Sequence, residues 1–331
     1  MRLATYNIEW FSALFDRDDR LILDARPSRR HDVDRYTQGR AIAQVLQRLD
    51  ADAVMVIEAP NTGRTQRSTR ALEAFAAEAG LRAREAVSGF ANDTQQEITL
   101  IYDPDVLDAV HDARASAAVP RFDGVFAADG FAGAETGETR FSKPPLELAV
   151  TTCGGSHLRM IGAHLKSKAP HGARSGSEIP RIAISSRRKQ LAQALWLHRR
   201  VAEHVAAGEH VVVLGDLNDG PGLDEYERLF GQSTVEIVMG DLLTDPNAET
   251  MLQPHPQSLP TTSRFYNTET QRYFCALLDY VLVSRSLMGF APAWRIWHPF
   301  EDAECYADED LRAALLDASD HFPVTLDIAL P

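Results

Sequence analysis

The sequence is poor in cysteine, with Cys153, Cys275 and Cys305 as the only three in 331 residues. Their odd number and wide spacing exclude a disulfide framework and argue against a structural zinc site, which uses closely spaced thiolates. We interpret them as buried free thiols. The sequence also lacks long apolar runs and a basic-then-apolar leader, since it opens on the strand-like segment 3–8. We therefore expect no membrane span and a cytoplasmic location.

An excess of positive charge is absent as well. The chain has 34 basic and 47 acidic residues and a net charge of −13. This balance excludes a protein that coats nucleic acid generally, because sequence-independent binding depends on clustered Lys and Arg. It is compatible with a nuclease, because a metal ion and a local basic rim can hold a phosphate on an acidic body.

What is present is typical of a globular protein. The chain is 44% hydrophobic and 24% charged, with no repeat and no shift in composition, so we predict one catalytic domain over 1–331. Apolar runs predict strands, and amphipathic runs predict helices at 38–49, 66–80, 180–207, 223–230 and 308–317. The predicted strands are 2–8, 53–57, 97–102, 146–152, 158–164, 210–215, 277–283, 292–297 and 322–328.

Three stretches, 113–142, 167–179 and 244–271, have the composition of irregular loops. Several strands follow one another without a helix between them, as over 146–164. This order favours an α/β (α+β) sandwich of two sheets over an alternating βαβ barrel.

Polar residues follow the apolar run 211–214 in the segment Gly215-Asp216-Leu217-Asn218. By alternation, Asp216 and Asn218 share one side at the carboxyl end of a strand, where they could orient a water and hold a phosphate oxygen. A polar turn explains an isolated motif of this kind equally well.

Two further carboxylates lie beside apolar strands near the C-terminus. Asp279 interrupts the run 277–283, and its burial would be costly without a partner, for which His321 is the natural candidate. Asp320, next to His321, could bind a metal. The alternatives are an edge-strand Asp that faces solvent and a surface His in a helix-exit loop.

The N-terminal half supplies a similar set. Glu58 ends the apolar strand 53–57 and is our first choice as a ligand of a hard divalent cation, although a surface Glu is the alternative. Asn7 and Glu9 share one face of the first strand, where they could contribute an amide contact to phosphate and a further carboxylate. His164 ends another strand, could pair with Glu97, and precedes two phosphate-binding candidates, Lys166 and Lys168. A structural His and solvated lysines are the alternatives.

Taken in order from Asn7 to His321, these segments resemble the endonuclease/exonuclease/phosphatase superfamily, the metal-dependent phosphoesterases related to DNase I and to exonuclease III-type abasic-site endonucleases. The resemblance implies a four-layer DNase I-like fold, in which two mixed β-sheets pack face to face between flanking helices, with one pocket at the top. It implies Glu58 as the principal metal ligand, supported by Asn7, Asp320 and, less securely placed, Glu9.

The resemblance also implies catalytic roles. Asp216 and Asn218 form the pair that orients water and contacts phosphate, Asp279 and His321 the carboxylate–imidazole pair, and His164 with Glu97 a second such pair. Lys143 stands where the family often has Arg, so the charge is kept and the bidentate fork is lost. Arg140 could fill the same role.

The expected reaction is Mg²⁺- or Mn²⁺-dependent hydrolysis of a phosphodiester by in-line attack of water, with Ca²⁺ as a further candidate ion and a phosphomonoester as a further candidate substrate. Either Asp216 or His164 would activate the water.

DNA or RNA is the leading substrate, and we expect a monomer. The alternatives are a phosphoesterase for small molecules or lipid headgroups and, last, a binding protein with a degenerate site. No apolar hairpin for membrane contact is evident in the sequence. A basic segment could line a groove for a nucleic-acid backbone or form a solvated helix face; it contains Lys166, Lys168, Arg174, Arg181, Arg187, Arg188 and Lys189.

Overall fold

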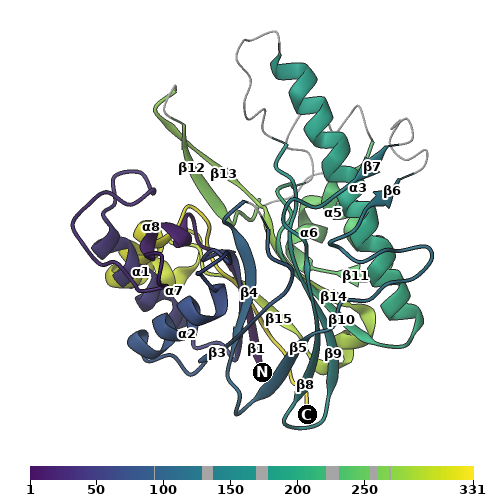
Figure 1. Ribbon diagram of the computed structural model, residues 1–331, viewed down its shortest axis with the longest axis horizontal. Coiled ribbons are helices and arrows are strands. Elements are labelled where there is room, and N and C mark those ends of the chain that lie inside the picture. The colour runs from purple at the N-terminus through teal and green to yellow at the C-terminus, as the bar shows by residue number, and fades with distance from the viewer. Residues whose placement is uncertain (93, 129–136, 169–177, 221–230, 254–258, 268–269) are drawn as a thin grey trace.

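Two six-stranded mixed sheets form the body of the computed structural model (Figure 1), which describes residues 1–331 except 93, 129–136, 169–177, 221–230, 254–258 and 268–269. The first sheet has the order β15-β16-β1-β2-β4-β3. Its strands, in sequence order, are β1 (Arg2–Asn7), β2 (Ala53–Ala59), β3 (Glu85–Ser88), β4 (Glu97–Tyr102), β15 (Ala293–Ile296) and β16 (Val324–Asp327).

The second sheet has the order β11-β14-β10-β9-β8-β5. In each sheet one central pair is parallel, β1 with β2 and β9 with β10, so their carboxyl ends meet at one edge. The strands of this sheet are β5 (Leu107–His111), β8 (Leu146–Thr152), β9 (His157–His164), β10 (His210–Asp216), β11 (Leu243–Thr244) and β14 (Asp279–Ser284).

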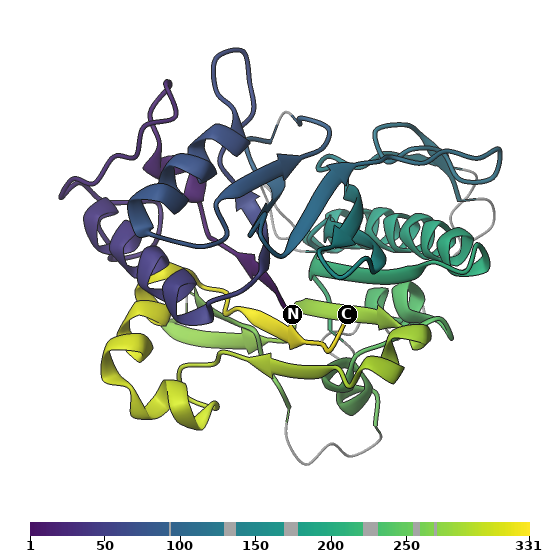
Figure 2. The same ribbon diagram turned by 90° about the horizontal axis from the view of Figure 1, so that it is seen from below.

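Helices cover the outer faces of both sheets, on opposite sides of the molecule (Figure 2). The first sheet packs against η1 (Phe11–Leu14), α1 (Arg35–Leu49), α2 (Ser68–Ala79), α7 (Ala303–Ala307) and α8 (Glu309–Ala318). The second packs against α3 (Ile179–Ala206), α5 (Thr234–Met239) and α6 (Pro246–Met251). The short helix η3 (Arg285–Phe290) instead contributes Leu287 to the core between the sheets.

The inner faces of the two sheets share a third core, which contains apolar side chains from both. Gly162 marks how closely they approach, because a Cβ at this position would lie 2.4 Å from Sδ of Met55 in the facing sheet. Alternation along each strand therefore sends one side chain to this inner core and the next to a helix-covered core. The predicted four-layer sandwich is confirmed.

A third structural unit, the hairpin of β12 (Ser263–Asn267) and β13 (Arg272–Ala276), projects from the body (Figure 1). The prediction that 244–271 is irregular was wrong here and at α6. The hairpin does not lie between two covering layers, so its sequence lacks the regular apolar alternation of a half-buried strand. Within 113–142, the short strands β6 (Phe126–Ala127) and β7 (Glu138–Thr139) also pair.

Other sequence predictions have mixed outcomes. Of the cysteines, only Cys305 is buried, so the expectation that Cys153 and Cys275 are buried was wrong. The predicted helix 223–230 lies outside the described residues. Among the helices that are described, none is both long and apolar enough to cross a membrane.

Candidate active site

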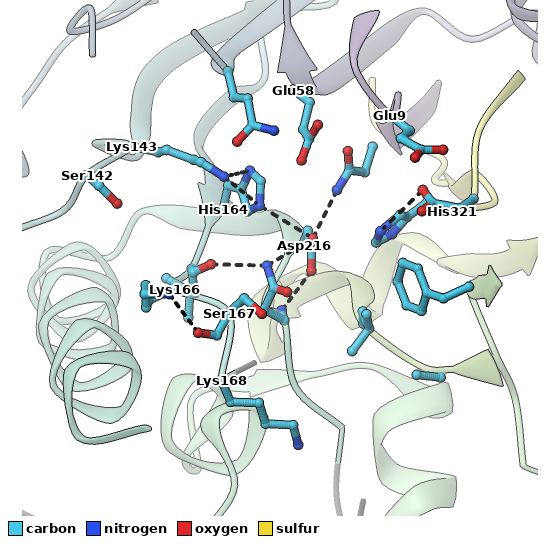
Figure 3. Close-up of a pocket in the computed structure, with 18 of the residues that line it drawn as sticks. Glu9, Glu58, Ser142, Lys143, His164, Lys166, Ser167, Lys168, Asp216 and His321 are labelled. Atoms are coloured by element: carbon cyan, nitrogen blue, oxygen red, sulfur yellow. Dashed lines mark hydrogen bonds and ion pairs between the residues drawn. The ribbon is translucent and has the colours of Figure 1, made fainter. Parts of the chain in front are cut away.

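A cavity of about 950 Å³ opens where the carboxyl ends of β1, β2, β9 and β10 meet (Figure 3). Residues from separate elements line it together: Asn7, Glu58, His164, Asp216 and His321. The order of these residues in the sequence does not show how close they lie in space. The topology brings them together at one edge of the sandwich: Asn7, Glu58, His164 and Asp216 lie at the carboxyl ends of β1, β2, β9 and β10, and His321 precedes β16, which runs antiparallel to β1.

Glu58 reaches the cavity through a local break in the sheet. The pairing of β2 with β4 shifts register between Ile57 and Ala59, and Glu58 adopts a left-handed backbone conformation with φ of 60°. A bulge of this kind re-aims a side chain that strict alternation would direct elsewhere. Trp10 N donates to Glu58 Oε2 over 3.3 Å. Burial raises the pKa of Glu58, and nearby Lys143 opposes the rise.

Asn7 places an unused acceptor in the same region. Its Nδ2 donates to Asp216 Oδ2 over 3.0 Å, whereas its Oδ1 is buried and has no hydrogen-bond partner among the described residues. Asp320 is close by, and burial raises the pKa of its carboxyl group to about 7, a rise that His321 opposes. Amide and carboxylate oxygens are the ligands that hard divalent cations prefer. Asn7, Glu58 and Asp320 therefore suit a hard divalent cation.

Glu9 lines the cavity as expected, but its carboxylate is already engaged. Arg30 Nη1 lies 2.7 Å from Glu9 Oε2, and both side chains are largely buried. Arg30 is fixed in turn by hydrogen bonds to Leu316 O. Because its carboxylate is engaged in this ion pair, we place Glu9 next to the candidate metal ligands and not among them.

Asp216 is held in place through both of its oxygens. Oδ1 accepts the backbone N–H of Asn218 over 2.7 Å, and Oδ2 accepts Asn218 Nδ2 over 3.1 Å. Burial raises the pKa of Asp216 to about 7, and the neighbouring Asp279 adds to the rise. Gly215 makes this turn feasible, because it has φ of 136° and a Cβ there would lie 2.0 Å from Ala163 O.

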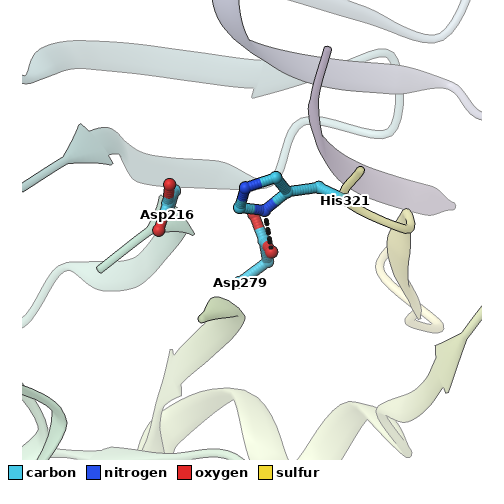
Figure 4. Close-up of side chains that lie close together, drawn as sticks. All are labelled: Asp216, Asp279 and His321. Atoms are coloured by element: carbon cyan, nitrogen blue, oxygen red, sulfur yellow. Dashed lines mark hydrogen bonds and ion pairs between the residues drawn. The ribbon is translucent and has the colours of Figure 1, made fainter. Parts of the chain in front are cut away.

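The predicted pairing of Asp279 with His321 is confirmed (Figure 4), with 2.7 Å between Asp279 Oδ2 and His321 Nδ1. Thr262 Oγ1 donates to the same carboxylate oxygen over 2.8 Å. Burial alone would lower the pKa of His321, but the Asp279 and Asp216 carboxylates raise it well above the usual value. The imidazole is therefore a buried cation.

Asp216, Asp279 and His321 form a compact cluster in which one ligand atom of each lies within 4.8 Å of the others. It is a poorer cation site than the set formed by Asn7, Glu58 and Asp320. His321 favours its protonated form, and a protonated imidazole cannot bind a metal. Asp279 already accepts hydrogen bonds from His321 and Thr262.

His164 has a different partner from the predicted one. Lys143 Nζ lies 3.1 Å from each of its ring nitrogens, and His164 Nε2 lies 3.6 Å from Asp216 Oδ2. The predicted pairing with Glu97 was wrong, since Glu97 accepts hydrogen bonds from Thr62 N and Asn92 Nδ2. Burial, together with Lys143, lowers the pKa of His164 well below its usual value, so this imidazole is neutral.

Lys143 lines the cavity, as expected for a residue that stands where the family often has Arg. Arg140 is exposed and is not among the described residues that line the cavity. Burial lowers the pKa of Lys143, and Glu58 opposes the fall. Lys166 and Lys168 line the same cavity. They form a cationic wall on the segment that follows β9.

The basic segment does not act as one surface. Arg187 is buried, and its Nη1 lies 2.5 Å from Asp219 Oδ2, so it supports the cavity wall and is not an exposed contact for a phosphate backbone. Lys168 Nζ lies 3.0 Å from the other oxygen of Asp219. Arg181 and Arg188 are exposed on α3, and Arg174 lies outside the described residues.

Comparison with known proteins identifies the family of this chain. The model of the Endonuclease/Exonuclease/phosphatase family matches residues 4–321. The chain belongs to this family. It is therefore a phosphoesterase of this superfamily, whose enzymes generally depend on divalent metals. A search of curated proteins returned no match.

Solved structures of low identity share the family fold. Truncated TDP2 from Caenorhabditis elegans is 14% identical, with a TM-score of 0.54 over 99% of this chain and 97% of that one. The 3′ phosphatase NExo from Neisseria, solved with a product DNA hairpin, is 16% identical, with a TM-score of 0.51 over 100% of both chains. A mannosyl-6-phosphatase from Bacteroides thetaiotaomicron is 14% identical, with a TM-score of 0.53 and 100% coverage of both.

This family member also uses residues that sequence reasoning missed. Arg30 neutralises Glu9, and Thr262 supports Asp279. Phe265 and Phe274 of the β12–β13 hairpin line the cavity. The run Arg264-Phe265-Tyr266 was a usable signal for the hairpin, because aromatic residues are enriched in strands.

Proposed function

We propose that this phosphoesterase is a divalent-metal-dependent phosphodiester hydrolase that cleaves DNA or RNA by in-line attack of water. One observation carries the proposal: a single cavity combines hard oxygen donors with an imidazolium held by a buried carboxylate. The first group suits a cation, and the second suits negative charge that develops on a phosphate. Lys143, Lys166 and Lys168 add positive charge around the same space.

Asn7, Glu58 and Asp320 would hold the metal. The bound ion would supply Lewis-acid stabilisation of charge on phosphate and leaving-group oxygens. Glu9 is neutralised by Arg30, which also donates to Leu316 O, so Glu9 adds no free charge to the set. Among the candidate ions, Mg²⁺ and Mn²⁺ match a site built from two carboxylates and one amide oxygen better than Ca²⁺, which takes more ligands.

We assign Asp216 as the general base that accepts a proton from the attacking water. Hydrogen bonds from Asn7 and Asn218 fix the orientation of its carboxylate, and its pKa of about 7 suits a base at neutral pH. His164 is a weaker candidate, because Lys143 occupies its ring nitrogens. His321 presents Nε2–H to the charged pentavalent state, while Asp279 holds Nδ1.

Two glutamates of the same sheet test the metal assignment. Glu58→Gln is expected to weaken Mn²⁺ binding, measured by titration calorimetry, and to lower turnover by about 100-fold or more. Glu97→Gln is the control, because Glu97 is buried at the start of β4 in the same sheet, but its carboxylate accepts hydrogen bonds from Thr62 and Asn92. Equal losses in the two variants would contradict the site assignment.

A substrate panel tests the class of ester. Plasmid, single-stranded DNA, abasic duplex, RNA, bis-p-nitrophenyl phosphate and p-nitrophenyl phosphate would be compared with Mg²⁺, Mn²⁺ or Ca²⁺. Metal-dependent cleavage of a nucleic acid that salt inhibits steeply supports the nuclease proposal. Turnover of the monoester alone would replace it with a phosphatase, the second class represented among the structural neighbours.

A further inference from the structure

The wall of the cavity beside His321 is aromatic. Phe265 and Phe274 occupy directly opposed positions on β12 and β13, so their side chains share one face of the hairpin. Both line the cavity, and the Phe265 ring lies 5.3 Å from the His321 ring, nearly perpendicular to it. Phe274 is 54% exposed. Within the described part of the chain, about half of this ring is therefore an apolar surface left open beside the reacting groups.

The opposite face of the hairpin does not line the cavity and is partly covered by protein. Tyr266 and Tyr273 point to that side, where Tyr266 packs on His31 at 4.8 Å. Arg264 stacks over the Tyr273 ring. The two faces therefore differ, because only the face with Phe265 and Phe274 lines the cavity.

The hairpin is attached directly to the catalytic segment. Ser263 forms a β-bridge with His321, and Arg264 N donates to Asp320 O over 2.7 Å. Phe322 N donates to Thr262 O over 2.6 Å. These backbone bonds fix the Phe265–Phe274 face relative to the groups that contact the phosphate, as a specificity surface requires.

We propose that Phe265 and Phe274 bind an unpaired nucleobase next to the scissile phosphate, so that the substrate is single-stranded DNA or RNA. This inference rests on the nuclease function proposed above. Aromatic side chains stack on bases of every kind, and cationic groups hold the connecting phosphates. Both features line this cavity, with Lys166 and Lys168 as the cationic part.

A base within a duplex could not stack on Phe265 and Phe274 in this way. In a duplex, each base face is covered by its neighbours in the stack, so a protein ring can reach it only after unstacking. A lipid chain is also a poorer occupant, because the aromatic pair faces the cavity while Asn267 and Arg272, beyond it toward the hairpin end, are polar. The sequence showed no apolar hairpin, and the structure shows a hairpin with an aromatic pair beside the cavity and polar residues toward its end.

A substrate–protein double-mutant cycle tests the proposal. The kcat/KM of the wild type would be measured on a short single strand and on the same strand with an abasic residue at each position around the cleavage site. Removal of the stacked base should lower kcat/KM by about 5- to 150-fold at one position. Phe274→Leu should lose a similar factor on the intact strand and be insensitive to the abasic residue at that position.

Tyr273→Leu is the matched control, because Tyr273 is equally exposed but lies on the opposite face. It should retain the wild-type response to base removal. Cleavage of single strands with the same abasic penalty in wild type and Phe274→Leu would overturn the stacking proposal and leave the nuclease function intact. Failure of the wild type to cleave any nucleic acid would overturn both, and turnover of sphingomyelin vesicles that depends on Phe274 would replace the base with a lipid.

Discussion

Two buried histidines in this protein are held by carboxylates, yet their surroundings differ. His321 gives Nδ1 to Asp279 and lines the cavity. His204, in α3, has Nδ1 2.5 Å from Glu209 and Nε2 2.7 Å from Glu147, so both nitrogens are occupied. A carboxylate partner therefore does not by itself mark a functional histidine. The second nitrogen must remain available to a substrate.

The largest expected effect is on the histidine that faces the cavity. His321→Ala should lower kcat by about 10²- to 10⁴-fold, because the variant loses a charged donor at the reacting phosphate. Steady-state rates on bis-p-nitrophenyl phosphate would measure the loss, and circular dichroism would check folding. Activity within a few-fold of wild type would remove His321 from the mechanism.

The next largest effect should come from its positioning residue. Asp279→Asn removes the charge that raises the pKa of His321, so the imidazolium should deprotonate at lower pH. We expect about a 100-fold loss of kcat near neutral pH and an alkaline limb that shifts toward acid. A pH–rate profile distinguishes this from a structural defect, since simple unfolding would lower the amplitude without moving the limb.

Metal binding should depend moderately on pH. With a pKa of about 7 in the metal-free protein, Asp320 is about one-tenth ionised near pH 6 and about nine-tenths ionised near pH 8. Because the ionised carboxylate binds the cation, affinity for Mn²⁺ should rise about 10-fold over this interval. Calorimetric titrations at both pH values would measure it, and Asp320→Asn should weaken binding and flatten the dependence.

The smallest effect on turnover should follow from His204→Ala. This change leaves the buried carboxylate of Glu147 without one of its partners, so the free energy of unfolding should fall by about 1–3 kcal/mol. The kcat of the folded enzyme should stay within about two-fold of wild type, because His204 lies in the last turn of α3 and does not line the cavity. Urea denaturation and steady-state kinetics measure the two quantities, and a large loss of kcat would erase the contrast with His321.

Residues whose position follows from the strand pattern were predictable. Asp279 interrupts an apolar strand, and a carboxylate in that position needs a partner, so its pairing with His321 was foreseeable. The same reasoning gave the wrong partner for His164. Strand ends indicate which side chains reach one edge of the sandwich, but they do not rank the neighbours there, and Lys143 arrives from a loop.

The sequence by itself determined the two-sheet sandwich and the polar residues at its strand ends, because alternation and strand ends are local properties of the chain. The order of its short motifs also determined the resemblance to the family, and that resemblance implied the four layers. The tertiary structure alone decided how the charges are used. It buried Arg187 against Asp219, engaged Glu9 with Arg30 and turned Phe265 and Phe274 toward the cavity. These outcomes depend on contacts between segments far apart in the sequence, which no local pattern encodes.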